Sequence, residues 1–367
     1  METKLIGTSI LKEWLATNKK VTVLDIRSDS DRAEWSMPGS VHYNIIEKVK
    51  NNDMSALDGV KLDKSLPVVT VCNGGNASKI AANMLTAKGF EAYSLEGGMK
   101  AWNYAWDTAE ISFKNVKIIQ VRRMAKACLS YIIGSGTEAL VIDASLDPQV
   151  YQDLAKENNW TIRKVLDTHI HADFVSRTKD LANVVHAVHL MMESAKVEYN
   201  FTPLKPGEEI KVGKTTLKVL HTPGHTWEST SFLIEGEVVF TGDTLFTDGI
   251  GRPDLKADIQ ESKRKAASLF ESLKELADLQ DETLVLPAHA SSSVSVGQDL
   301  ISARIVELST SIEALNMEKD DFVTSTLTNL PDAPPNYLTI AEINKKGDAG
   351  DYVIADLEAG GNHCAVT

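Results

Sequence analysis

Two histidines and an aspartate lie close together in the chain, as His169, His171 and Asp173, directly after a short apolar run. The run at 164–166 predicts a buried strand, and the pattern at 175–185 predicts a helix. Side chains at such a strand end can point into one pocket, where neutral imidazole and carboxylate groups bind metals. The cluster therefore suggests a metal site, and a surface loop of His and Asp is the simpler alternative.

Three further segments repeat this arrangement, in which an apolar strand ends in a tight turn with a metal-binding side chain. These turns carry His225, Asp243 and His289. Layered α/β folds place such residues on loops at one edge of their sheets. The motifs HxHxD, PGHT, TGDT and a late PxH, in this order over roughly residues 113–289, resemble the metallo-β-lactamase superfamily. The resemblance implies an αββα fold for this part of the chain.

Length, charge and cysteine usage limit the alternatives. The 367 residues suggest two domains, which we place at 1–110 and 111–367, with an extension from about 295. The net charge of -13 argues against binding to nucleic acid or to an anionic membrane. No apolar stretch is long enough to span a bilayer, and the N-terminal residues lack a signal-peptide core. Three widely spaced cysteines indicate free thiols in a reducing, cytoplasmic setting: Cys72, Cys128 and Cys364.

Strands and helices alternate in the first 110 residues, which predicts a parallel sheet flanked by helices. The expected strands are at 21–27, 68–71 and 92–95, and the expected helices at 9–16 and 77–87. Cys72 follows a strand, on a glycine-containing loop ahead of a helix. Backbone N–H groups in such a loop stabilise an anion, and the thiolate is the nucleophilic form of cysteine. A buried, inert cysteine is the alternative.

This region resembles a rhodanese in the Asp25/Arg27 strand, the Pro38-Gly39 turn, the loop at 72–78 and Gly97-Gly98 before Trp102. The resemblance implies that Cys72 carries sulfur as a persulfide and transfers it. Many members that use thiosulfate have an arginine where this chain has Ala77 and a basic residue where it has Asn73. The loop therefore lacks side-chain positive charge, which argues against the thiosulfate dianion as the preferred donor.

Phe174 changes the expected metal content. Dinuclear sites of the superfamily normally use HxHxDH, and Phe174 replaces the last histidine. A phenyl ring cannot coordinate a metal, so we expect one ion per chain. Asp173 and His289 would then orient other ligands or form the remainder of a second site.

The first site keeps His169, His171, His225 and Asp243. A reduced set of two histidines and one carboxylate with open positions suits non-haem Fe(II) and O₂ chemistry. Zinc with a bound hydroxide is the alternative.

The segments HIHADF, TPGHT and GRPDL resemble bacterial persulfide dioxygenases, several of which are fused to rhodanese domains. The resemblance implies one Fe(II) held by His169, His225 and Asp243, with His171 beside it as a hydrogen-bond donor. It also implies that a thiol persulfide, such as glutathione persulfide, is oxidised by O₂ to sulfite and thiol. The expected partners are therefore a small thiol persulfide and O₂, with no nucleic acid and no membrane.

Arg252 matches a position of that family near the thiol substrate, where its guanidinium could bind a carboxylate. A surface ion pair with Asp248 or Asp254 is the alternative. We expect residues 106–112 to connect the domains and residues 356–367 to pack on the second domain or in a dimer contact.

Two other functions stay open, a zinc-dependent thioester hydrolase of the glyoxalase II type and a non-catalytic sulfur carrier. We also expect a homo-oligomer, either a dimer or a tetramer. Cys128 lies in an apolar alternation and is predicted to be a core residue.

Overall fold

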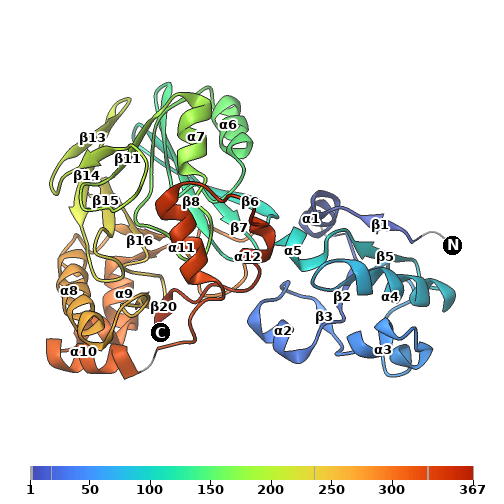
Figure 1. Cartoon of the computed structure of the whole chain (residues 1–367). Coiled ribbons are helices and arrows are strands. Elements are labelled where there is room, and N and C mark those ends of the chain that lie inside the picture. Colours follow the sequence, from blue (N-terminus) through green and yellow to red (C-terminus); the bar gives the residue numbers. More distant parts are fainter. Residues whose placement is uncertain (1–2, 18, 235, 329, 367) are drawn as a thin grey trace.

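The computed structural model describes residues 3–17, 19–234, 236–328 and 330–366, which form two domains (Figure 1). The first domain is a five-stranded parallel sheet in the order β1-β5-β4-β2-β3, which confirms the predicted parallel sheet. Its strands are β1 (Leu5–Ile6), β2 (Thr22–Asp25), β3 (Val41–His42), β4 (Val68–Val71) and β5 (Ala92–Leu95). Its helices are α1 (Thr8–Ala16), α2 (Asp29–Glu34), α3 (Ile46–Lys50), α4 (Asn76–Ala87) and α5 (Gly98–Trp102).

The central strand β4 explains why this sheet folds as it does. All four of its residues are buried, because helices cover both faces of the sheet and leave no polar side for alternation. One hydrophobic cluster includes Leu11, Val71 and Trp102, and a second includes Val68 and Leu85. Strand β4 thus delivers Cys72 to the edge of a fully covered sheet.

The second domain contains two sheets packed face to face. The seven-stranded sheet has the order β12-β11-β10-β9-β8-β7-β6 and the six-stranded sheet the order β13-β14-β15-β16-β18-β19. The first consists of β6 (Trp106–Phe113), β7 (Val116–Arg123), β8 (Leu129–Ser135), β9 (Glu138–Ile142), β10 (Thr161–Leu166), β11 (Val188–Met192) and β12 (Thr202–Leu204). The second consists of β13 (Glu209–Val212), β14 (Thr215–His221), β15 (Thr230–Ile234), β16 (Val238–Gly242), β18 (Leu284–Pro287) and β19 (Ala303–Arg304).

Helices cover the outer face of each sheet. The core between the sheets brings Tyr131 and Leu140 of one sheet against Val219 and Phe240 of the other. Residues of α6 (Pro148–Glu157) and α7 (Thr178–Val185) pack on the first sheet. Residues of α8 (Ile259–Ala277), α9 (Ile305–Ser311) and α10 (Lys319–Thr328) pack on the second. These four layers confirm the predicted αββα fold.

The segment at 106–112 is not a connecting loop, and this expectation was wrong. It forms most of β6, which pairs with β7 along its whole length in antiparallel register. The side chains of β6 are mostly half-buried, as on an edge strand, so the sequence shows only weak alternation there. Helix α7 also begins later than expected, because residues 167–177 form the loop that carries His169 and His171.

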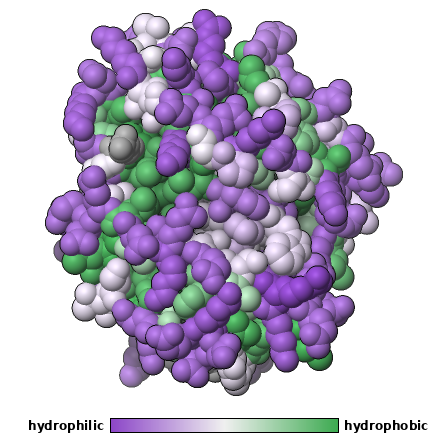
Figure 2. All heavy atoms as spheres, turned by 90° about the vertical axis from the view of Figure 1, so that its left-hand side faces the viewer, coloured by the Kyte–Doolittle hydropathy of each residue, from purple (hydrophilic) through white to green (hydrophobic). Residues whose placement is uncertain are grey.

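The last part of the chain returns to the junction of the two domains (Figure 1, red). It contains α11 (Tyr337–Lys346), α12 (Ile354–Leu357) and β20 (Ala365–Val366), and β20 pairs with the short strand β17 (Ile250–Gly251). Among the described helices, none is long and apolar enough to cross a membrane. Hydrophilic residues cover most of the face shown in Figure 2, with hydrophobic ones visible between them.

Candidate functional site

Four strands of the second domain end at the same place and supply the polar side chains of the site. His169 follows β10 of the first sheet, while His225, Asp243 and His289 follow β14, β16 and β18 of the second. All four side chains are buried. The two sheets therefore meet at an edge where loops from both can surround one small ion.

His169, His225 and Asp243 form what we call the ligand triad. One ligand atom of each lies within 4.8 Å of the other two. Oδ2 of Asp243 is 3.6 Å from Nε2 of His169 and 3.7 Å from Nε2 of His225. Both Nε2 of His169 and Oδ2 of Asp243 are buried without a hydrogen-bond partner. Buried polar atoms normally have partners, so these orphaned atoms fit a metal ion between them.

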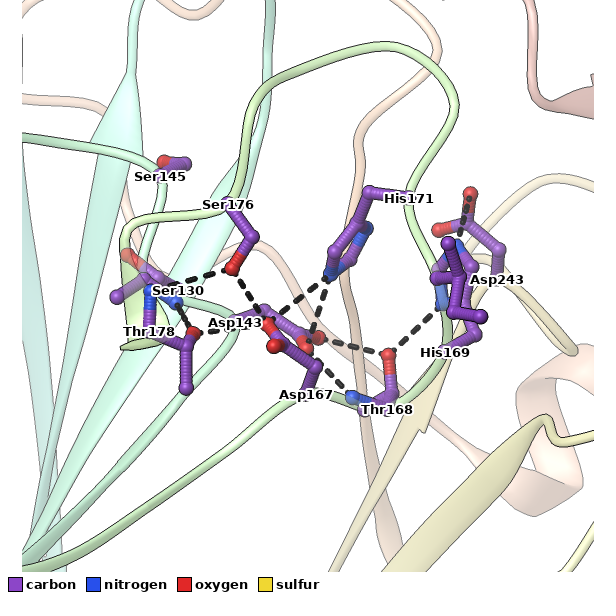
Figure 3. A network of polar contacts seen from close by, with 12 residues as sticks. Ser130, Asp143, Ser145, Asp167, Thr168, His169, His171, Ser176, Thr178 and Asp243 are labelled. Carbon is purple, nitrogen blue, oxygen red and sulfur yellow. Dashed lines mark hydrogen bonds and ion pairs between the residues drawn. The ribbon is translucent and has the colours of Figure 1, made fainter. Parts of the chain in front are cut away.

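The hydrogen bonds around the triad fix which ring nitrogens face the metal position. Oγ1 of Thr168 donates to Oδ2 of Asp143 and so accepts from Nδ1 of His169, each at 2.9 Å (Figure 3). Nδ1 of His225 donates to the backbone oxygen of Arg252 at 2.8 Å. Each ring therefore keeps its Nε2 lone pair for a ligand, as is usual for metal-binding histidines.

Burial also keeps these rings neutral. Burial lowers the pKa of His169 well below its ordinary value, and the nearby ring of His171 lowers it further, against the opposing effect of Asp243. Burial likewise lowers the pKa of His225. Neutral imidazole is the form that binds metal, so the protein prepares both ligands before an ion arrives.

His289 contacts the triad through Asp243 and holds that carboxylate in place. Its Nδ1 donates to Oδ1 of Asp243 at 2.6 Å, and its Nε2 lies 2.7 Å from Oδ2 of Asp173. Burial alone would lower the pKa of His289, but these two carboxylates raise it well above its ordinary value. The contact leaves Oδ2 of Asp243 free for the metal position.

His171 and Phe174 occupy the region next to the triad. Nε2 of His171 lies 3.1 Å from Oδ1 of Asp143, and its Nδ1 is buried without a partner. The rings of His169 and His171 are 4.2 Å apart between centroids. The Phe174 ring lies 4.2 Å from that of His171 and 6.1 Å from that of His289. The phenyl ring of Phe174 thus occupies the space beside His171 and His289 and offers no metal ligand there.

Two cysteines, which the sequence motifs did not indicate, also lie at the site. Sγ of Cys128 donates to Oδ2 of Asp173 at 3.6 Å, and Cys128 groups with Asp173 and His289. Cys364 groups with Asp243 and His289. Cys128 is buried as expected of a core residue, yet its sulfur contacts polar groups. Residue spacing could not reveal Cys364, because only the returning chain brings it to the site.

Arg252 is placed differently from the expectation that its guanidinium binds substrate. Its Nε and Nη2 donate to the two oxygens of Asp254 at 2.8 and 2.9 Å. Its remaining donors go to the backbone oxygens of Pro331, Asp332 and His363. All five N–H groups are therefore occupied, and Arg252 is buried as an anchor for two later segments.

A pocket of about 330 Å³ opens beside His225, one member of the triad. Its lining combines the apolar Ile170 and Trp227 with two carboxylates and four ammonium groups. The charged residues are Glu228, Glu261, Lys196, Lys256, Lys265 and Lys345. Because the lysines outnumber the glutamates, a cavity of this size suits a small molecule that carries carboxylates.

In the loop after β4, two backbone N–H groups point at the sulfur of Cys72. Sγ of Cys72 accepts from the backbone N of Gly75 at 3.2 Å and of Ser78 at 3.3 Å. Gly98, with φ of +59°, passes so close that a Cβ there would collide with the backbone oxygen of Cys72. Ala77 is buried in this loop's helix, and Oδ1 of Asn73 accepts from Arg27.

Two family models match separate parts of the chain. Residues 8–105 match the family model of the rhodanese-like domain, and residues 124–289 match that of the metallo-beta-lactamase superfamily. A hydroxyacylglutathione hydrolase of Bartonella henselae is 34% identical over 151 residues, which are 40% of this chain and 56% of that protein. One of Prochlorococcus marinus is 29% identical over 152 residues, 39% of this chain and 58% of that protein. The chain spans little more than half the length of these curated relatives.

Two solved structures are similar to much of the chain. A metallo-beta-lactamase from Staphylococcus aureus is 28% identical with a TM-score of 0.57, covering 64% of this chain and 73% of that one. ETHE1 from Myxococcus xanthus is 28% identical with a TM-score of 0.53, covering 65% of this chain and 98% of that one. The chain therefore joins a rhodanese-like domain to a domain of the metallo-beta-lactamase superfamily.

Proposed function

We propose that the protein oxidises a small thiol persulfide, such as glutathione persulfide, with O₂ to sulfite and thiol. The observation that carries the proposal is the ligand triad of two histidines and one carboxylate, beside which Phe174 fills the second imidazole position. The rhodanese-like domain supports it, because a domain of that kind transfers the same sulfur species. The segments HIHADF, TPGHT and GRPDL also resemble persulfide dioxygenases.

The donor set fits one Fe(II) per chain. His169 and His225 would hold it through Nε2 and Asp243 through Oδ2, and two of these three atoms are buried without a partner. Fe(II) held in this way would keep open coordination positions, and the chemistry that it would supply there is the activation of O₂. Zinc remains the alternative metal for the same three atoms.

The surrounding residues would hold the ligands in place and admit the substrate. Thr168 orients His169, and His289 orients Asp243. The pocket beside His225 would take the thiol, with its lysines near the carboxylates of a glutathione-like molecule. His171, whose Nδ1 has no partner, is placed to donate to a bound water or substrate.

Cys72 would serve the first domain as a sulfur carrier. The N–H groups of Gly75 and Ser78 point at its sulfur and stabilise negative charge there. The loop brings no cationic side chain of its own to this sulfur, because Ala77 and Asn73 are neutral. The donor would therefore be a small persulfide rather than thiosulfate.

A zinc-dependent thioester hydrolase is the second candidate, because curated relatives are named hydroxyacylglutathione hydrolases. That name and our proposal share a glutathione-linked sulfur compound as substrate. They differ in the reaction, since hydrolysis consumes water and persulfide oxidation consumes O₂. The expected homo-oligomer stays a prediction.

The deciding experiment measures O₂ uptake and sulfite release by iron-loaded protein given glutathione persulfide. We expect uptake in proportion to bound iron and its loss in His225→Ala, which removes a triad ligand. His221→Ala is the matched control, because His221 ends β14 nearby and contacts the backbone of Trp227 instead. Thioester hydrolysis by zinc-loaded protein without O₂ uptake by the iron form would favour the second candidate.

A further inference from the structure

The tail segment (residues 358–366) runs from the junction of the two domains into the metal site. Glu358 is fully buried, and its carboxylate lies 2.9 Å from the guanidinium of Arg123. Farther along, Nε2 of His363 lies 3.0 Å from Oε1 of Glu34, which belongs to α2 of the first domain. The tail segment is therefore fixed to both domains before it reaches the metal site.

Two glycines allow the tail segment to pass against α2. Gly360 has φ of +115°, which side-chain-bearing residues rarely adopt, and a Cβ there would lie 2.9 Å from Oε1 of Glu34. A Cβ on Gly361 would lie 2.5 Å from the backbone oxygen of Glu34, and its N donates to Oε1 at 3.1 Å. The two glycines thus allow the tail segment to lie directly against α2 of the first domain.

At its far end the tail segment places a thiol at the ligand triad. Strand β20 pairs with β17, and the backbone N of Arg252 donates to the oxygen of Cys364 at 3.0 Å. The Cys364 side chain is buried and groups with Asp243 and His289, their ligand atoms lying within 4.8 Å of one another. Oδ2 of Asp243 is the buried oxygen without a partner. A thiol of the chain itself therefore lies beside Asp243, one residue of the ligand triad.

The tail segment also contacts the hydrophobic cluster that lies beside Cys72 in the first domain. Ala359 packs against a hydrophobic cluster of the first domain that includes Val71 and Met99. Val71 directly precedes Cys72, and the backbone N of Met99 donates to the backbone oxygen of Cys72 at 2.9 Å. One short segment thus connects the elements that hold Cys72 with the metal site.

We propose that Cys364 is an internal sulfur acceptor, which takes the outer sulfur from a Cys72 persulfide and presents it to the ligand triad. The second step rests on the dioxygenase function proposed above. The substrate class then includes a persulfide on the chain's own tail as well as a free small thiol persulfide. Cys72 and Cys364 are both buried, so transfer requires the tail segment to leave β17. That pairing spans only two residues on each strand, so its opening is a local event.

The chemistry balances in two steps. The Cys364 thiol gives up its proton as its sulfur attacks the outer sulfur of the Cys72 persulfide, the sulfur–sulfur bond at Cys72 breaks, and Cys72 leaves as a thiolate that takes up that proton. This transfer changes no net oxidation state. In the second step the Cys364 persulfide, one O₂ and one water give sulfite, the Cys364 thiol and two protons. The outer sulfur loses four electrons, which O₂ accepts.

The test follows sulfur by mass rather than by turnover. The full-length protein is loaded with glutathione persulfide without O₂, freed of small thiols, alkylated at intervals and digested for mass spectrometry. We expect one added sulfur first on the Cys72 peptide and then on the Cys364 peptide. The Cys128 peptide is the matched control, because Cys128 is buried at the same site but lies outside the tail segment.

Two variants make the result decisive. In Cys72→Ser, Cys364 should stay unmodified, whereas labelling at the wild-type rate would overturn the relay. Glu34→Ala removes the anchor of the tail segment on the first domain, and the transfer rate should change at least about threefold while Cys72 still loads. A Cys364 peptide that stays unmodified while Cys72 is loaded would also overturn it.

Admission of O₂ separates the two proposals. Loaded wild-type protein with iron should lose the Cys364 label and release an equal amount of sulfite. A persistent label with no sulfite, and no oxidation of added glutathione persulfide, would refute the dioxygenase function but leave the sulfur transfer intact. Oxidation of added glutathione persulfide by a protein whose Cys364 never gains sulfur would refute the relay alone.

Discussion

The polar residues of the triad could be predicted from the sequence because each follows an apolar strand directly. His169, His225 and Asp243 lie in turns that follow apolar strands, so the sequence predicts that they gather at one sheet edge, while the resemblance to persulfide dioxygenases implies that these three hold the metal. The position of Arg252 could not be predicted in the same way. Its ion pair with Asp254 is the alternative that the sequence offered, but its other partners come from residues 331–332 and 363, and only the folded chain brings them to its guanidinium.

Thr168 offers a test of how the triad is oriented. Thr168→Val keeps the side-chain shape but removes the oxygen that accepts from Nδ1 of His169. We expect the affinity for iron to fall about 10- to 100-fold, as for other groups that hold a metal ligand through a hydrogen bond. Thr222→Val, which removes a buried hydroxyl that pairs with Ser231, is the control. Equal iron affinities in the two variants would contradict this role.

Phe174 offers a test of the metal count. Phe174→His returns an imidazole to the space between His171 and His289, next to Asp173. Elemental analysis should rise from one metal ion per chain toward two, because the missing ligand is restored. Phe174→Leu keeps the site apolar and should stay at one. Two tightly bound ions in the unaltered protein would mean that Asp173, His289 and Cys128 already complete a second site.

At the scale of elements, buried strands were predicted well and half-exposed ones poorly. Three of the four residues of strand β4 are valines and all four are buried, and its boundaries agree with the prediction. Strand β6 lies at a sheet edge, where half-buried side chains give no clear alternation, so it was mistaken for a connection. Packing against β7 rather than local sequence decides its conformation.

The loop between β4 and α4 allows a test of donor choice. Ala77 is buried, so arginine there would disturb the core, whereas Asn73 is only partly buried. Asn73→Arg should raise kcat/KM for thiosulfate roughly tenfold, because a charge-assisted hydrogen bond contributes about 1.5–3 kcal/mol before solvent screening. Asn73→Gln, which adds length without charge, should give no gain. The assay is thiocyanate formation from thiosulfate and cyanide. Equal kcat/KM values for the two variants would exclude missing positive charge as the factor that limits the use of thiosulfate.

At the scale of the whole molecule, one buried carboxylate ties the domains together. Glu358 lies against Arg123, accepts from Tyr104 after α5 and accepts from the backbone N of Val175 in the histidine loop. No sequence pattern announces this residue, because its partners lie more than 180 positions away. Burial and the Glu358 carboxylate also raise the pKa of Tyr104 above its ordinary value, so the hydroxyl stays a donor.

Breaking the ion pair of Glu358 and Arg123 should therefore lower the free energy of unfolding of both domains. Glu358→Gln leaves the fully buried Arg123 without its counter-charge, and such losses cost about 3–5 kcal/mol. Urea denaturation should show this loss in both domains. The control is Glu342→Gln, whose exposed pair with Lys256 should contribute about 0–1 kcal/mol. A similar midpoint for the two variants would show that Glu358 does not couple the domains.

The pairing of β6 with β7 also determines how the two sulfur sites meet. Because the chain enters the second domain as a hydrogen-bonded strand, the first domain has no flexible tether on which to search. Transfer of sulfur from Cys72 to Cys364 of the same chain then follows intramolecular kinetics. Its rate constant should stay the same when the protein is diluted a hundredfold, whereas delivery by a free thiol should slow in proportion. Even at low protein concentration, a chain built in this way would pass the reactive sulfur between its own cysteines without releasing it.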